Sequence, residues 1–130
     1  MSDSGLVVAD ASAVIALLVD EPFTRFEPQR LVTASISAVN LSEVLARLLQ
    51  LGVPESAADG AVAGLDLQIV AFDDKQARTT ARLREVTRHA GLSLADRACL
   101  ALGLHLNAPV VTADRVWAAI EVGVEIVLIH

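Results

Sequence analysis

The stretch Leu6-Val7-Val8-Ala9-Asp10 begins the part of the chain that decides the fold. Its apolar residues predict a buried strand that ends at Asp10, and the apolar run over 12–20 predicts a helix directly after it. Further strands are predicted at 34–37, 67–72, 109–112 and 124–129, and further helices at 40–51, 54–65, 74–89, 93–106 and 114–122. Strands that alternate with helices favour an α/β protein whose parallel sheet is covered on both faces.

Composition narrows the class of protein. The chain has 130 residues, of which 54% are hydrophobic and 3% aromatic, so we expect one domain over 1–130 with a core of Ala, Val, Leu and Ile. The longest apolar runs are too short to cross a bilayer, and no signal peptide is recognisable, so we expect no membrane association. The single cysteine, Cys99, excludes an internal disulfide and fits a cytoplasmic location.

The net charge of −6 makes non-specific binding to nucleic acid weak, because phosphate contacts supply most of that affinity. Nine of the ten basic residues are Arg. Any RNA or DNA would therefore be held by local Arg side chains and by metal. One helical stripe, formed by Lys75, Arg78 and Arg82, could follow an RNA backbone or be a solvated face.

Four acidic residues stand where predicted strands end or predicted helices begin: Asp10, Glu43, Asp96 and Asp114. In a parallel sheet, ligands bind beyond the carboxyl ends of the strands, where Asp10 and Asp114 fall directly. Four carboxylates in one pocket repel each other and raise each other's pKa unless a cation lies among them. The set therefore indicates a hard divalent metal and metal-assisted hydrolysis of a phosphate ester.

Each acid taken alone also has a structural explanation. Asp10 and Asp114 could cap the helices that follow them. Two pairs, Asn40 with Glu43 and Ser93 with Asp96, have the spacing of a capping box. The functional interpretation therefore depends on the four acids acting as a set.

Neighbouring polar residues could support the acids. The hydroxyls of Ser12 and Thr112, each two residues from a site acid, could orient a carboxylate or touch a phosphate. Arg97 and Arg115 each follow a site acid, and either could reach a scissile phosphate or form a salt bridge. We expect Cys99 in the core and Trp117 in packing or at an interface.

Four segments together resemble the PIN-domain ribonucleases, specifically the VapC toxins of bacterial toxin–antitoxin pairs. They lie in family order and span nearly the whole chain: 8–13 (VADASA), 36–44 (ISAVNLSEV), 91–100 (GLSLADRACL) and 111–117 (VTADRVW). Pro28 departs from the family, which often has an uninterrupted helix there.

This resemblance implies a three-layer α/β/α sandwich with a central, mostly parallel five-stranded sheet. It also implies endonucleolytic cleavage of RNA, a cognate antitoxin and a homodimer. Mg²⁺ or Mn²⁺ would be held by Asp10, Asp96 and Asp114, and Glu43 would complete the shell or position the attacking water. Supporting residues would be Ser12, Asn40, Thr112 and Arg97. One-metal and two-metal chemistry both stay open.

Two other hypotheses fit parts of the sequence. A non-catalytic binding module on the same fold would lose its acids without consequence. A phosphate-transfer enzyme could use Asp10 as nucleophile. Such enzymes usually carry a second Asp two residues later, where this chain has Ser12, and the only lysine is Lys75.

Overall fold

A computed structural model describes residues 5–130. Its single sheet contains five strands in the order β3-β2-β1-β4-β5, and each neighbouring pair is parallel. The strands are β1 (Val8–Ala9), β2 (Ser35–Ser37), β3 (Gln68–Val70), β4 (Val110–Thr112) and β5 (Ile126–Leu128). The predicted five-stranded parallel sheet is confirmed, although most strands are shorter than their apolar runs suggested.

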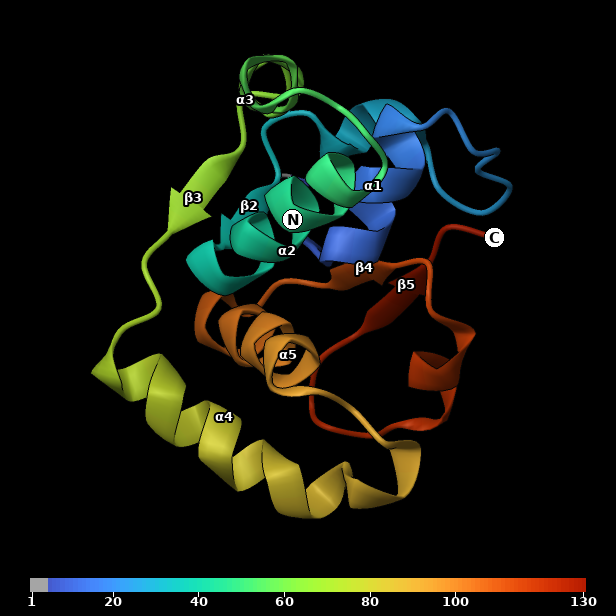
Figure 1. Ribbon diagram of the computed structural model, residues 1–130. Helices are drawn as coiled ribbons and strands as arrows, with labels where there is room; N and C mark the ends of the chain where they lie inside the picture. The colour runs from blue at the N-terminus through green and yellow to red at the C-terminus, as the bar shows by residue number, and fades with distance from the viewer. Residues whose placement is uncertain (1–4) are drawn as a thin grey trace.

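Helices cover both faces of this sheet (Figure 1). On one side lie α1 (Ala11–Leu18), α2 (Ala38–Gln50) and α3 (Glu55–Ala63), and on the other lie α4 (Asp74–Val86) and α5 (Leu94–Leu106). Three short 3₁₀ helices join them: η1 (Pro28–Leu31), η2 (Arg88–Ala90) and η3 (Arg115–Ala119). The three-layer α/β/α sandwich is therefore confirmed. Within 5–130, no helix is both long enough and apolar enough to span a bilayer.

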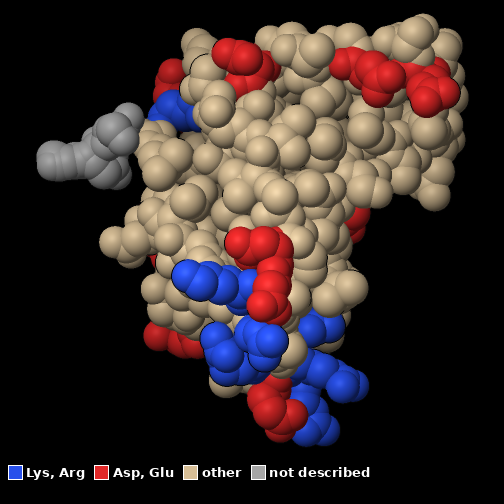
Figure 2. Space-filling model, turned by 90° about the vertical axis from the view of Figure 1, so that its left-hand side faces the viewer, with Lys and Arg blue, Asp and Glu red and all other residues tan. Residues whose placement is uncertain are grey.

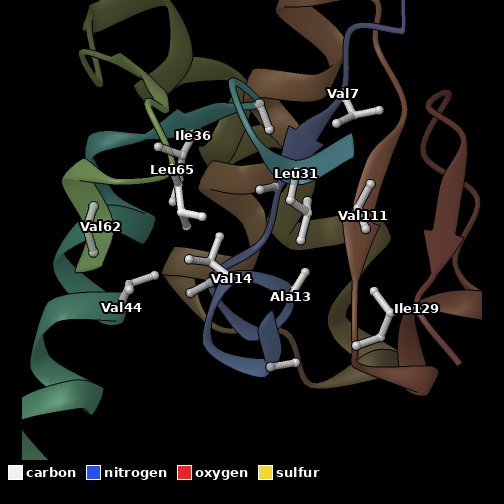
Figure 3. Packing of buried hydrophobic residues seen from close by; sticks show 14 of the residues in the cluster. Val7, Ala13, Val14, Leu31, Ile36, Val44, Val62, Leu65, Val111 and Ile129 are labelled. Carbon is white, nitrogen blue, oxygen red and sulfur yellow. The ribbon is translucent and has the colours of Figure 1, made fainter. Parts of the chain in front are cut away.

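The central strands contribute to two cores, because successive side chains of a strand point to opposite faces. Val7 and Ala9 pack with α1, α2 and α3, whereas Val8 packs with α5. In the same way, Val111 joins the first core and Val110 the second. Figure 3 shows the first core, in which small aliphatic side chains from helices and strands meet. The expected aliphatic interior is present.

The second core is built around α5, which is buried through its middle, from Ala98 to Gly103. Cys99 and Trp117 both have 0% exposure, so each is a packing residue. Gly103 lets α5 approach the sheet closely, because a Cβ atom there would lie 2.5 Å from Cγ2 of Val110. The close packing of α5 on β4 fixes the start of α5, where Asp96 lies.

Two predicted helices differ from the structure, one in its start and one in its type and length. The α2 helix begins at Ala38, and the Ser37 side chain caps it by accepting from the Val39 amide at 3.2 Å. Asn40 therefore lies inside the helix, and its spacing to Glu43 is not an N-terminal capping box. The predicted helix 114–122 is only the 3₁₀ helix η3. Pro28 occupies the first position of η1, which fits the predicted interruption there.

Candidate functional site

One pocket of about 400 Å³ brings all four acidic residues together at the carboxyl edge of the sheet. Asp10 follows β1 and Asp114 follows β4, whereas Glu43 comes from α2 and Asp96 from the first turn of α5. The remaining lining residues are Ser12, Ile15, Ala46, Arg47 and Gln50. The carboxylates thus converge from two strand ends and two helices.

Asp10 is buried, with 4% exposure, and two hydroxyls hold its side chain. Ser12 Oγ donates to Oδ2 of Asp10 at 2.6 Å, and Thr112 Oγ1 donates to the same oxygen at 2.8 Å. These hydroxyls accept in turn from the amides of Ala113, at 2.9 Å, and Asp114, at 3.1 Å. Ser12 and Thr112 therefore orient a carboxylate. Within residues 5–130, Oδ1 of Asp10 accepts no hydrogen bond.

Burial is the main influence on the ionisation of Asp10. It raises the pKa of this carboxyl from 3.8 to about 6, against the lowering effect of the Ser12 and Thr112 hydrogen bonds. The negative charges of Asp96 and Glu43 raise the pKa further, but they contribute less than burial does. The repulsion expected from the sequence is thus present among Asp10, Glu43 and Asp96, with desolvation as the larger effect. A nearby cation would stabilise the ionised form.

Asn40 fixes Glu43 and ties α2 to α5. It is fully buried, and its Nδ2 donates to Glu43 Oε1 and to the Ala95 carbonyl, both at 3.1 Å. Its Oδ1 is buried without a hydrogen-bond partner among residues 5–130. Burial raises the pKa of Glu43; the Asn40 bond opposes this rise and the charge of Asp96 adds to it. The amide therefore positions a carboxylate that holds its proton more tightly than usual.

Asp96 and Asp114 both take part in helix capping and both line the pocket. The Asp96 amide donates to Ser93 Oγ at 3.1 Å and the Ser93 amide donates to Asp96 Oδ2 at 2.9 Å, which confirms the predicted capping box. Oδ1 of Asp114 accepts from the Val116 amide at 3.0 Å. Asp10, in contrast, makes no side-chain cap to α1, so the capping interpretation was wrong for it. Capping at the other two positions does not remove them from the pocket.

Each of the four carboxylates thus uses one oxygen to fix its orientation and keeps a second one free of hydrogen bonds from residues 5–130. In that same range, no group of three or more Asp, Glu, His or Cys side chains is placed to hold a metal ion directly. Mg²⁺ prefers oxygen ligands and keeps several waters when it binds. The free carboxylate oxygens are therefore of the donor type that a hydrated divalent cation would take.

Arg97 lies outside the pocket. Its Nη1 donates to the Thr80 carbonyl at 3.2 Å, so the side chain joins α5 to α4. The ion pairs found within 5–130 are Arg78 with Asp74 and Arg88 with Glu85, so the predicted salt bridge of Arg97 is absent there. Arg97 thus has a structural contact with α4, and its supporting role in the site stays a prediction.

Two polar lining residues, Arg47 and Gln50, were not predicted. They lie four and seven residues after Glu43 on α2, which is the spacing of one helix face. That spacing was a usable signal once Glu43 had been placed in the site. Lys75, the only lysine, does not line the pocket, which weakens the phosphate-transfer hypothesis further.

Comparisons with known proteins show the family of the chain and relate its fold to solved structures. The PIN domain family model matches residues 7–123. VapBC from Salmonella typhimurium, solved bound to DNA, is 20% identical, with a TM-score of 0.72 and coverage of 93% of this chain and 96% of that one. Mycobacterium tuberculosis VapC20, a toxin that cleaves the sarcin–ricin loop, is 17% identical, with a TM-score of 0.70 and coverage of 92% and 98%. No curated protein sequence matches the chain.

Proposed function

This chain belongs to the PIN-domain family, and we propose that it is a metal-dependent endoribonuclease acting as the toxin of a toxin–antitoxin pair. The observation that carries the proposal is the pocket lined by Asp10, Glu43, Asp96 and Asp114. RNA cleavage is supported by the likeness to VapC20, a toxin that cleaves the sarcin–ricin loop. The toxin role is supported by likeness to VapBC complexes.

In this proposal, the free carboxylate oxygens of Asp10, Asp96 and Asp114 would hold Mg²⁺ or Mn²⁺. A bound ion of this kind polarises a phosphoryl oxygen and eases deprotonation of water. Asp10 supplies the best-fixed oxygen, because Ser12 and Thr112 hold its other oxygen in place. The burial of Asp10 strengthens its electrostatic interactions relative to water.

Glu43 positions the attacking water and accepts its proton. Burial raises the pKa of Glu43, which makes the carboxylate a better proton acceptor near neutral pH. The Asn40 amide holds Oε1, so Oε2 is left for the water. The water oxygen bonds to phosphorus as the bond to the leaving sugar oxygen breaks, and that oxygen is then protonated.

The antitoxin would bind along α2. An apolar groove of about 430 Å³ runs along this helix and includes Leu41, Leu45 and Leu49, the last with 48% exposure. Ala46 lines both this groove and the acidic pocket. A helix of a partner protein seated in the groove would therefore lie against the pocket and block access by RNA.

The test is cleavage of a cellular RNA pool by the purified protein in Mg²⁺, Mn²⁺ or EDTA, beside the Asp10→Asn variant. Discrete cuts that require metal and disappear in the variant would support the proposal. Metal binding without cuts in any condition would limit the activity to a narrow substrate. The absence of both cuts and metal binding would refute the enzymatic function and favour a binding module on the same fold.

A further inference from the structure

Arg47 is the one basic side chain among the residues that line the acidic pocket. We propose that Arg47, oriented by Gln50, binds the RNA phosphate next to the scissile one. The inference rests on the proposed ribonuclease function and adds to it a binding site for one phosphate group of the RNA. It starts from an arginine that shares a pocket with four carboxylates and pairs with none of them.

An ion pair between Glu43 and Arg47 would be the ordinary arrangement on a helix. An acid four residues before a basic residue has the favourable order for such a pair. Within residues 5–130, however, the ion pairs lie on α4 and η2, and Arg47 has no carboxylate partner. Its Nη1 donates instead to Gln50 Oε1 at 3.3 Å. The contact turns the guanidinium toward the end of α2, while its other N–H groups have no partner in the described chain.

A phosphate is the group that fits these free donors. The planar guanidinium can donate two parallel hydrogen bonds to phosphate oxygens, which a carboxylate-lined wall cannot do. The pocket otherwise repels RNA, because its charged residues are four acids and this one arginine. A divalent cation would offset only part of that charge. Arg47 would supply the remaining local attraction, in a chain whose net charge is −6.

The position of Arg47 along α2 selects which phosphate it binds. Four residues separate it from Glu43, or about 6 Å along a helix axis at 1.5 Å per residue. Glu43 is assigned to the attacking water, so Arg47 lies one turn away from the reacting phosphorus. It therefore contacts a neighbouring phosphate, and the contact is the same before and during the reaction. A contact that is equally strong in the bound substrate and in the transition state lowers KM and leaves kcat unchanged.

The experiment compares Arg47→Ala with Arg82→Ala, which removes the same charge from an exposed position on α4. Arg82 is a demanding control, because basic side chains gather over this part of the surface (Figure 2). We expect Arg47→Ala to raise KM about 10- to 100-fold, the loss typical of a charge-assisted hydrogen bond, with kcat nearly unchanged. Arg47→Lys should recover part of that loss, and Gln50→Ala should show a smaller one.

Binding gives a second readout that does not need cleavage. In the Asp10→Asn background with Mg²⁺, fluorescence anisotropy of a short, labelled, mixed-sequence single-stranded RNA measures affinity against salt. Loss of one phosphate contact should reduce the slope of log K against log salt by about 0.7. If the wild type shows no metal-dependent cleavage, the proposed ribonuclease function is refuted. This binding assay would still test the role of Arg47.

Three results would overturn the inference. Equal losses in Arg47→Ala and Arg82→Ala would show only general attraction between RNA and basic side chains. An unchanged KM and salt slope would show that Arg47 is a solvated side chain. A fall in kcat at constant KM would place the guanidinium on the reacting phosphate, contrary to the assignment made here.

Discussion

Replacement of Asp10 by Asn should stabilise the metal-free protein at neutral pH. Burial raises the pKa of this carboxyl from 3.8 to about 6. Below pH 3.8 the carboxyl is protonated in both folded and unfolded chains. As pH rises to 6, the unfolded chain ionises while the folded chain keeps its proton, so stability falls by about 3 kcal/mol at 1.4 kcal/mol per pKa unit. An amide at position 10 does not ionise and avoids this loss.

The Asn side chain can also keep the local hydrogen bonds. Its Oδ1 can accept from Ser12 and Thr112, as Oδ2 of Asp10 does, and its Nδ2 would take the place of the free oxygen. Urea unfolding in EDTA at a series of pH values would measure the free energy of unfolding of both proteins. The advantage of the variant should grow between about pH 4 and pH 6 and then stay level at up to about 3 kcal/mol.

A matched control is Asp59→Asn, which removes an exposed carboxylate from α3. A difference between Asp10→Asn and wild type that stays constant with pH would refute desolvation of Asp10. Mg²⁺ at about a thousandfold its Kd should reverse the order, because it would stabilise the folded wild type by about 4.1 kcal/mol, which exceeds the advantage of the variant. Equal stabilisation of both proteins by Mg²⁺ would argue against Asp10 as a metal ligand.

Three further substitutions test contacts that support the site. Asn40→Ala should destabilise the protein by about 1–3 kcal/mol in urea unfolding and lower RNA cleavage, because it leaves Glu43 unsupported; full activity would contradict that support. Ser93→Ala should cost about 1 kcal/mol and Ser93→Gly only a few tenths, since an N-cap is lost; equal costs would question the cap. Gly103→Ala should cost about 1–3 kcal/mol in thermal unfolding, and a double-mutant cycle with Val110→Ala should show coupling between the two sites.

Periodicity predicted the architecture well because the strands and helices are separated by clear breaks in the sequence. The apolar run before Asp10 belongs to a buried strand that contributes to both cores, as a parallel sheet covered on both faces requires. The placement of the four acids in one pocket follows from the same topology, because two of them end parallel strands. Their roles toward metal and RNA stay predictions.

Local ambiguity explains the misses. Asn40 and Glu43 are neighbours whether the pair starts a helix or lies within one, so spacing alone could not find the cap at Ser37. Arg97 follows a site acid in sequence, but on a helix the next residue points elsewhere, and here it contacts α4. Arg47 is four residues from Glu43 and shares its helix face. The spacing along a helix is therefore a better guide to which residues line this pocket than adjacency in the sequence is.

The buried thiol of Cys99 can serve as a native probe of local opening and of ion binding. Burial raises the pKa of this thiol well above its ordinary value, and the charges of Asp10, Asp96 and Glu43 add to the rise. A thiol reagent can therefore modify it only when the α5 layer opens, so the labelling rate measures that opening. An ion bound to the carboxylates of the folded state would slow labelling by mass action. Occupancy of the site can thus be followed through a single native cysteine, without RNA and without an introduced probe.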